Sequence, residues 1–352
     1  MNNVTPIHIL ISNELAELLI TREISTDFVD VHGRTILHLG ALNGNMEIMK
    51  YSLENGCSVD VRDSFGLTAL HRAVQGNYQE VVSFLIDNGT DINAEDNNGH
   101  TSLLFAARNN CINITDILIK KEVCTSSDRI ASLCSAVCEG HHDIVRILLK
   151  QCAFDIHALQ DEHHLLHKAA ENGHLIVVKV LLENGFEINA GSKDTTDTPL
   201  HSAIYYNHLE VSQFLLSKGA DPNIRDQQGR TSLHVAASRG STDLVEILVD
   251  EKADVFIKDS KNMSVIELAV LFNQFNVVKL LMEMRKVNIN LKGNEGLTLL
   301  HLSAGIGSLD ITEYLIKNRA NINTRDVSGS KPIHTATRKG FKNIVEYYLN
   351  AT

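Results

Sequence analysis

A four-residue segment, Thr198-Pro199-Leu200-His201, recurs along the chain and limits its fold more than any other feature of the sequence. Variants of this segment place a histidine, or a residue that substitutes for it, once every 30 to 34 residues over the 352 residues. Repeats this short cannot each bury an apolar face, so they stack and build a shared core from neighbouring units. The equivalent positions are His8, His38, His71, Leu104, Cys134, His167, His201, His234, Glu267, His301 and His334.

Each unit carries the start and stop signals of a first helix. The motif threonine is a preferred N-cap residue, because its hydroxyl accepts a hydrogen bond from a free N–H of the first turn. Pro199 follows at the first helical position, where a missing N–H costs nothing. In ten of the eleven units the helix is predicted to end six residues after the motif position, because the residue there is of a type that readily adopts a left-handed conformation. These residues are Gly44, Asn77, Asn110, Gly140, Gly173, Asn207, Gly240, Asn273, Gly307 and Gly340.

A second helix and a turn complete the unit. Paired apolar residues such as Val177-Val178 and Leu181-Leu182 give a stripe of helical period. An Asp-x-x-Gly segment, for example Asp226–Gly229, then predicts a tight turn before the next threonine.

The recurring T-P-L-H-x-A segment at a period near 33 resembles the ankyrin repeat family. The resemblance implies an all-α solenoid of stacked helix-turn-helix units with β-turn fingers. About ten full repeats and a short N-terminal capping unit are expected, and residues 1–352 are expected to form a single solenoid. The predicted boundaries are 1–29 for the cap and 30–62, 63–95, 96–125, 126–158, 159–192, 193–225, 226–258, 259–292, 293–325 and 326–352 for the repeats.

Four units depart from the family pattern as follows. The unit around Cys134 lacks the Asp-x-x-Gly turn, and Leu159–Glu162 and Lys193–Thr196 occupy its place in the next two units. Irregular tips are therefore expected there. Glu267 replaces the motif histidine in the unit that contains Ser264-Val265-Ile266.

Composition restricts the class of partner and the compartment. The net charge is -11, and no Lys/Arg cluster is present, which argues against nucleic acid as the partner. No apolar run approaches the roughly 18 residues that span a bilayer, so membrane insertion is not expected. The six cysteines are too few for a disulfide framework, and the start of the chain lacks the basic region of a signal peptide. A cytoplasmic location is predicted, with the nucleus and secretion as an effector left open.

The histidines and cysteines raise the question of chemistry. The resemblance implies a structural role for the motif histidines, in which the imidazole bonds the motif threonine and neighbouring backbone. Cys134, Cys138, Cys152 and the histidines near them would supply zinc ligands if they converged, whereas the alternative is that the cysteines pack as small apolar side chains. The repeat register separates Cys134 from Cys152 and favours packing. No metal site, cofactor site or catalytic residue is predicted, because no phosphate-binding loop, metalloprotease or nucleophile motif occurs. The chain is not expected to be an enzyme.

Family resemblance also implies a protein-binding concave face made of the turn tips and the exposed side of each first helix. Most residues at those positions are polar. The exceptions lie in adjacent units and are of types enriched in binding hot spots or exposed apolar patches. An alternative is that these side chains only cover neighbouring turns. We name this set the aromatic patch: Tyr205, Tyr206, Arg239, Met263, Leu271, Phe272, Leu297 and Ile306.

Acidic residues (Glu139, Glu171, Asp194 and Asp197) are expected on one side of the aromatic patch, and Arg338-Lys339 on the other. The sequence thus predicts a monomeric, non-catalytic adaptor that binds a partner protein. An alternative is that the chain is the recognition region of a larger protein, such as a channel, a toxin or a secreted bacterial effector.

Overall fold

The computed structural model describes residues 29–121, 125–192, 196–285 and 287–350. Within these ranges the chain is all-helical, with 21 α-helices, a 3₁₀ turn at Asn294–Gly296 and two isolated β-bridges. The predicted all-α class is confirmed. The capping unit predicted for 1–29 lies outside the described residues, apart from its last residue.

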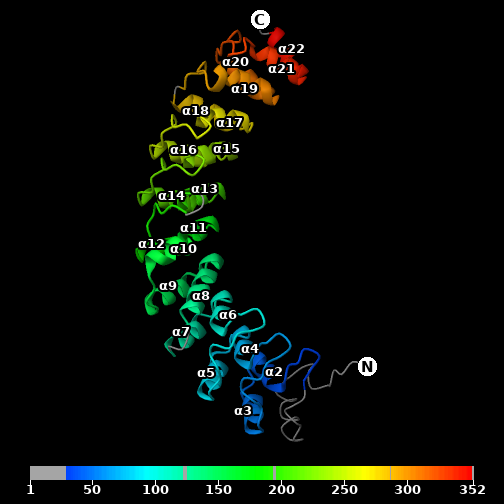
Figure 1. Cartoon of the computed structure of the whole chain (residues 1–352), viewed down its shortest axis with the longest axis vertical. Coiled ribbons are helices and arrows are strands. Elements are labelled where there is room, and N and C mark those ends of the chain that lie inside the picture. Colours follow the sequence, from blue (N-terminus) through cyan, green and yellow to red (C-terminus); the bar gives the residue numbers. More distant parts are fainter. Residues whose placement is uncertain (1–28, 122–124, 193–195, 286, 351–352) are drawn as a thin grey trace. The chain divides into compact units, whose positions relative to one another are not determined.

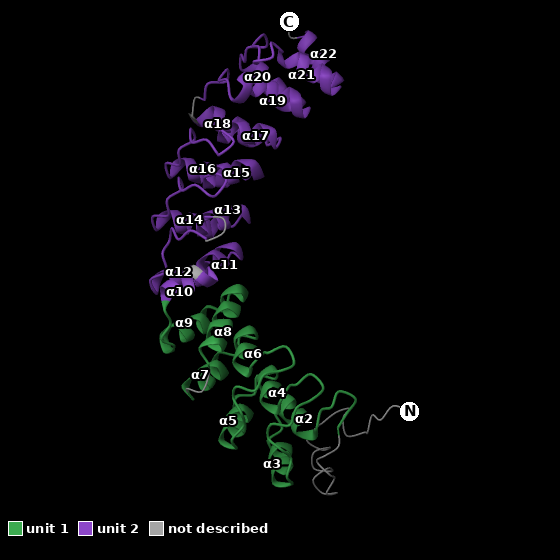
Figure 2. Cartoon of the chain, in the orientation of Figure 1, with its two compact units in different colours: residues 1–155 green, residues 156–352 purple. Residues whose placement is uncertain are grey.

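Two compact units make up the chain, residues 1–155 and residues 156–352 (Figure 2). The prediction of one uninterrupted solenoid over 1–352, with the repeat boundaries given above, stays a prediction. The helices of the first unit are α2 (Ile36–Asn43), α3 (Met46–Glu54), α4 (Ala69–Gln75), α5 (Gln79–Asp87), α6 (Ser102–Arg108), α7 (Ile112–Lys120), α8 (Ser126–Glu139) and α9 (His142–Gln151).

The second unit begins with α10 and continues with six helix pairs. In each pair the two helices run side by side, and each first helix also packs on the first helix of the next pair (Figure 1). The helices are α10 (Ile156–His163), α11 (Leu165–Glu171), α12 (Leu175–Glu183), α13 (Pro199–Tyr205), α14 (Leu209–Ser217), α15 (Ser232–Arg239), α16 (Thr242–Asp250), α17 (Val265–Leu271), α18 (Phe275–Arg285), α19 (Leu299–Ile306), α20 (Leu309–Lys317), α21 (Pro332–Lys339) and α22 (Lys342–Asn350).

Within the described ranges, five motif histidines link their repeat to the one that follows. The Thr198 N–H donates to His201 Nδ1 at 3.2 Å, so His201 is protonated on Nε2, which donates to the Arg230 carbonyl at 3.3 Å. Arg230 directly precedes the threonine of the following unit. The same Nε2 bond joins His38 to Leu67, His71 to His100, His167 to Asp197 and His301 to Ser330. The predicted structural role of these histidines is confirmed.

Burial of the motif imidazoles disfavours their charged form. It lowers the pKa of His201 below its usual value of 6.5, because a buried imidazolium loses its hydration. Burial acts in the same direction on the pKa values of His38, His71, His167, His234 and His301. The neutral tautomer that bridges two repeats is therefore the favoured form.

The predicted helix ends are confirmed. All ten Gly and Asn residues placed six positions after the motif histidine have positive φ, from 57° at Asn110 and Asn273 to 83° at Gly307. Lys252 and Arg319 also have positive φ, 66° and 68°, after their second helices. Gly219 has this role one repeat before Lys252, with φ of 92°.

A second link between repeats runs through the loops that follow the second helices. Asn189 Oδ1 accepts a hydrogen bond from the Asp221 N–H at 3.0 Å, and Asn223 Oδ1 accepts from the Asp254 N–H at 2.8 Å. Each asparagine thus satisfies a backbone donor of the next unit, and this fixes the register of the stack.

The prediction of an irregular tip at Leu159–Glu162 is wrong, because these residues lie in α10. Leu159 and Gln160 are buried, and Gln160 Oε1 accepts a hydrogen bond from the Glu187 N–H at 2.7 Å. Around Cys134 the missing turn is replaced by a longer first helix, α8, which has 14 residues and starts after its cap Thr125. At Lys193–Thr196, only Thr196 is within the described residues.

Candidate functional site

The aromatic patch lies wholly in the second unit, and its most prominent side chains are exposed. The exposed fractions are 47% for Tyr205, 48% for Tyr206, 38% for Leu271 and 58% for Phe272. Arg239 is also exposed. The remaining members, Met263, Leu297 and Ile306, are half-buried.

Local structure explains why the tyrosines face solvent. In α13 the apolar side of the helix is formed by Leu200, Ala203 and Ile204, which are fully buried. Tyr205 ends the helix and Tyr206 is its C-cap, so both lie at the helix end beyond the buried stripe. The packing of the repeat therefore does not dictate which side chains occupy these two positions.

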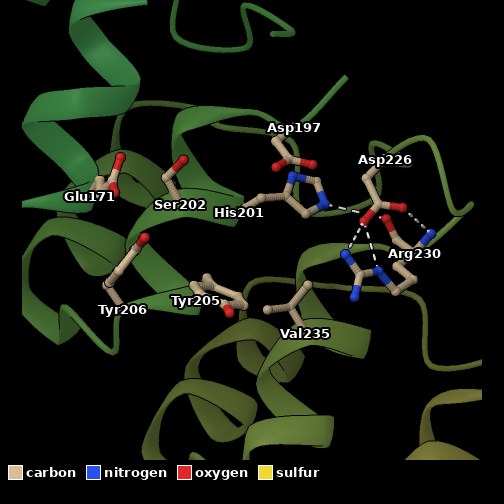
Figure 3. A pocket seen from close by; sticks show the side chains of 9 residues that line it. All are labelled: Glu171, Asp197, His201, Ser202, Tyr205, Tyr206, Asp226, Arg230 and Val235. Carbon is tan, nitrogen blue, oxygen red and sulfur yellow. Dashed lines mark hydrogen bonds and ion pairs between the residues drawn. The ribbon is translucent and has the colours of Figure 1, made fainter. Parts of the chain in front are cut away.

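A cavity of about 360 Å³, here called the first hollow, lies beside the two tyrosines. In Figure 3 the carboxylate of Glu171 and the hydroxyl of Ser202 lie on one side and the rings of Tyr205 and Tyr206 on the other. Its full lining is Glu171, Asp197, His201, Ser202, Tyr205, Tyr206, Asp226, Arg230 and Val235.

The charges around the first hollow are unevenly paired. Asp226 is buried and accepts hydrogen bonds from Arg230 Nε at 2.8 Å and from the Arg230 N–H at 2.7 Å, so these two charges offset each other. Glu171 accepts a hydrogen bond from the Tyr206 hydroxyl, which raises the pKa of Tyr206. Among the described residues, neither Glu171 nor Asp197 forms an ion pair.

The aromatic rings are held in a fixed arrangement. Tyr205 and Tyr206 meet edge to face, with ring centroids 5.1 Å apart and planes inclined by 71°. The guanidinium of Arg239, from the next repeat, lies over the Tyr205 ring at 4.2 Å from its centroid. This cation–π contact joins side chains of two adjacent repeats.

A second hollow, of about 310 Å³, lies beside Met263, Leu271 and Phe272. It is bounded by the turn at Asp259–Met263 and the end of α17. Met263 also covers the following turn, since its Sδ accepts a hydrogen bond from the Asn294 amide at 3.5 Å. Its full lining is Gln228, Arg230, Ser238, Asp259, Ser260, Lys261, Met263, Leu268, Leu271 and Phe272.

The two hollows occupy equivalent places in consecutive repeats. Adding the 33-residue period to five residues of the first hollow gives five residues of the second. Asp197 corresponds to Arg230, Tyr205 to Ser238, Asp226 to Asp259, Arg230 to Met263 and Val235 to Leu268. The same scaffold position is thus acidic and aromatic in one repeat, and more apolar in the next.

Family comparison agrees with this repeating geometry. The model described as ankyrin repeats in three copies matches residues 2–63, 39–128, 70–160, 133–226, 218–293 and 266–351. The chain belongs to the ankyrin repeat family. Ankyrin repeats form protein–protein interaction modules, and the family is generally non-catalytic.

The ankyrin proteins that this chain resembles are much longer, and the chain matches only a part of each. Over 165 residues it is 28% identical to alpha-latrocrustotoxin-Lt1a of Latrodectus tredecimguttatus, which covers 47% of this chain and 9% of the toxin. It is 27% identical over 185 residues to the human transient receptor potential cation channel subfamily A member 1, covering 52% of this chain and 14% of the channel. It is 26% identical over 235 residues to the palmitoyltransferase AKR1 of Lachancea kluyveri, covering 66% of this chain and 28% of the transferase.

The ankyrin register also places the residues predicted around the aromatic patch. Glu171 and Asp197 line the first hollow, as the predicted acidic side requires. Leu297 and Ile306 line neither hollow. Asp194 lies outside the described residues, and Glu139 belongs to the other compact unit.

Sequence reasoning missed Ser202, Asp226, Arg230 and Val235 as part of the site. Each occupies a position that ankyrin architecture needs for a turn or a helix, so none is unusual alone. The repeat period relates Asp226, Arg230 and Val235 to lining residues of the second hollow, whereas Ser202 has no counterpart there.

The cysteines and histidines considered for zinc lie on α8, α9 and α10 or next to them. Cys134 and Cys138 are half-buried on α8, and Cys152 is buried after α9. Burial raises the pKa of the Cys152 thiol. Among the described residues no three His, Cys, Asp or Glu side chains are grouped so as to hold a metal ion.

No helix within the described parts of the chain combines the length and the apolarity that crossing a membrane requires.

Proposed function

We propose that this ankyrin chain is a non-catalytic adaptor that holds a partner protein at the aromatic patch. The observation that carries the proposal is the cluster of exposed Tyr205, Tyr206, Leu271 and Phe272 beside two hollows of equivalent register. Exposed aromatic and aliphatic side chains lose the most unfavourable hydration when a partner covers them. Because adjacent repeats pack tightly beneath them, the surface is preorganised and less entropy is lost on association.

No step of the proposal requires chemistry by the chain. The titratable groups at the site have structural or surface roles: Asp226 pairs with Arg230, and His201 is bonded to backbone. The palmitoyltransferase among the relatives does not argue for activity here, because this chain covers 28% of that protein. We propose that the chain acts as a monomer in the cytoplasm. Size-exclusion chromatography with light scattering and cell fractionation test those two points.

Affinity capture tests the proposal directly. Tyr206→Ala combined with Phe272→Ala removes the two most exposed rings of the patch, and we expect it to abolish capture of a partner seen with the unaltered chain. The thermal unfolding midpoint should stay within a few degrees, because both side chains are about half exposed or more. Mass spectrometry of the captured proteins provides the measurement.

A matched control removes similar exposed apolar surface elsewhere in the second unit. Ile176→Ala with Phe256→Ala truncates side chains that are 49% and 68% exposed and line neither hollow. This control should keep the partner. The proposal is wrong if the patch variant captures the same proteins as the unaltered chain, or if it loses its fold.

A second candidate function is that the chain forms the recognition region of a larger protein. The toxin and the channel among the relatives favour it, since each carries the matched segment within a much longer chain. An antibody to this segment would then detect a native protein well above 38.9 kDa. A native band at that mass supports the free adaptor instead.

A further inference from the structure

The two hollows differ in chemistry although they occupy the same place in consecutive repeats. In the first, Glu171 and Asp197 present carboxylates with no ion-pair partner among the described residues, next to the open ring of Tyr206. In the second, Arg230 and Ser238 replace Asp197 and Tyr205, and Met263, Leu271 and Phe272 supply apolar surface. A partner that fits both must therefore carry two different side chains.

The charge balance decides what the first hollow accepts. Three carboxylates line it, and its one lining cation, Arg230, is paired with Asp226. The Arg239 guanidinium lies over the Tyr205 ring at 4.2 Å from its centroid, which shows that a cation fits against these rings. A cation between Glu171, Asp197 and Tyr206 would gain both carboxylate pairing and ring contact.

A ligand that fills both hollows must place two side chains at a separation of one repeat. First helices of adjacent repeats pack at about 10 Å, so equivalent points of the two hollows are separated by about that distance. In a polyproline II segment, side chains three residues apart lie on the same side at about 9 Å. A β-strand puts same-side residues at about 7 Å or about 13 Å, and neither matches one repeat.

We propose that the first hollow binds a lysine or arginine side chain of the partner, and that the second binds an apolar side chain three positions away in the same polyproline II segment. This inference rests on the proposed function and identifies the kind of segment that the aromatic patch recognises. Arg230 lines both hollows and is held by its ion pair with the buried Asp226. Aromatic surfaces suit such segments, whose backbone is already extended before binding.

A randomised nine-residue peptide library selected on the purified full chain tests the inference. We expect enrichment of sequences with Lys or Arg and a Leu, Ile, Met or Phe separated by two residues. Synthetic fluorescein-labelled copies of an enriched peptide, titrated by fluorescence anisotropy, should bind more weakly as salt rises, because the charges are partly exposed. Replacing the basic residue by citrulline should weaken binding about tenfold.

Paired variants locate each side chain. Glu171→Gln with Asp197→Asn should lower affinity for the basic peptide about tenfold and leave affinity for the citrulline peptide unchanged, because the polar contacts remain while the charges are lost. Glu171→Lys should reverse the preference towards a peptide with Glu at that position. Phe272→Ala should weaken binding of a peptide with the apolar residue and have little effect on one with Ala there.

The outcomes separate this inference from the proposed function. Enriched peptides that need Tyr206 and Phe272 but carry no basic residue, or a different spacing, overturn the inference and leave the proposed function standing. An unenriched library also overturns it, while partner capture through the patch would still support the adaptor. Peptides that bind equally to the Tyr206→Ala, Phe272→Ala variant contradict both.

Discussion

The two ends of α13, with their capping residues, show opposite relations between sequence and structure. Thr198 and His201 are buried, bonded to each other and tied to the following repeat. Tyr205 and Tyr206 are about half exposed and contact mainly each other, Arg239 and Glu171. The first pair joins adjacent repeats, whereas the second is exposed and should contribute less to folding. Partner binding is therefore expected at positions where the packing of the repeat does not determine the residue type.

Acidification is expected to give the largest change in stability, because it acts on the buried motif histidines. The six buried motif histidines with lowered pKa bind fewer protons in the folded than in the unfolded chain, so stability is complete above pH 6.5 and falls as the pH drops below it. At pH 5.5 the expected loss is about 1 kcal/mol for each histidine that stays neutral. Asp128, whose pKa is raised by burial, opposes this, but it is one group. Urea midpoints followed by circular dichroism at pH 7.5 and 5.5 provide the measurement.

Asp30 and Asp96 do not contribute to the stability change between pH 7.5 and 5.5. The Arg34 and backbone hydrogen bonds at Asp30 outweigh its burial and hold its pKa at about 2, and hydrogen bonds lower the pKa of Asp96. These groups titrate well below pH 5.5. A urea midpoint that does not change between the two pH values would contradict the buried, neutral state of the histidines.

A smaller effect is expected from removing one motif histidine. His201→Ala leaves the Thr198 N–H and the Arg230 carbonyl without their partner and opens a cavity, which should cost about 3 kcal/mol. His334 is the matched control, because it is exposed and follows Lys331 instead of threonine. His334→Ala should cost less than about 1 kcal/mol. Chemical unfolding of both variants measures the difference in stability. Equal losses of stability would contradict the distinction between the buried bridging histidine and the exposed one.

The smallest change in stability is expected at the exposed end of α13, where Tyr205 contacts Arg239. A double-mutant cycle with Tyr205→Ala and Arg239→Ala should give a coupling of about 0.5–1 kcal/mol, the range for an exposed cation–π pair. Thermal or urea unfolding of the four proteins measures it. A coupling near 3 kcal/mol would mean that this pair stabilises the fold as strongly as a buried contact, and would argue against a role of the pair in partner binding.

Much of the fold could be predicted from the sequence because the repeat uses residues with local conformational meaning. Thr198 and Pro199 signal a helix start, and Gly and Asn at the predicted stops do adopt positive φ. Lys252 and Arg319 adopt the same conformation at other positions, and nothing in their residue types indicates it. There the stacked neighbours override local preference.

Less of the site could be predicted, for physical reasons. Exposure of Tyr205, Tyr206, Leu271 and Phe272 follows from register alone, because positions after the buried stripe face solvent. The half-buried state of Met263 depends on contact with Asn294 in the next turn, which a single unit does not reveal. Similarly, α10 depends on Gln160 accepting a bond from a residue 27 positions later. The role of the eight patch residues in binding stays a prediction.

The histidine bridge has a consequence for how such a chain lengthens and diverges. A copy such as that of His201 carries a donor for its successor, the histidine Nε2, and an acceptor for its predecessor, the Asp197 carbonyl before its threonine. A duplicated 33-residue segment inserted between two copies would bring one half of each new joint and leave no buried partner unmatched. Tandem duplication is thus structurally neutral at these joints. Afterwards each copy is free to acquire its own surface residues, as the acidic and apolar hollows in neighbouring copies illustrate.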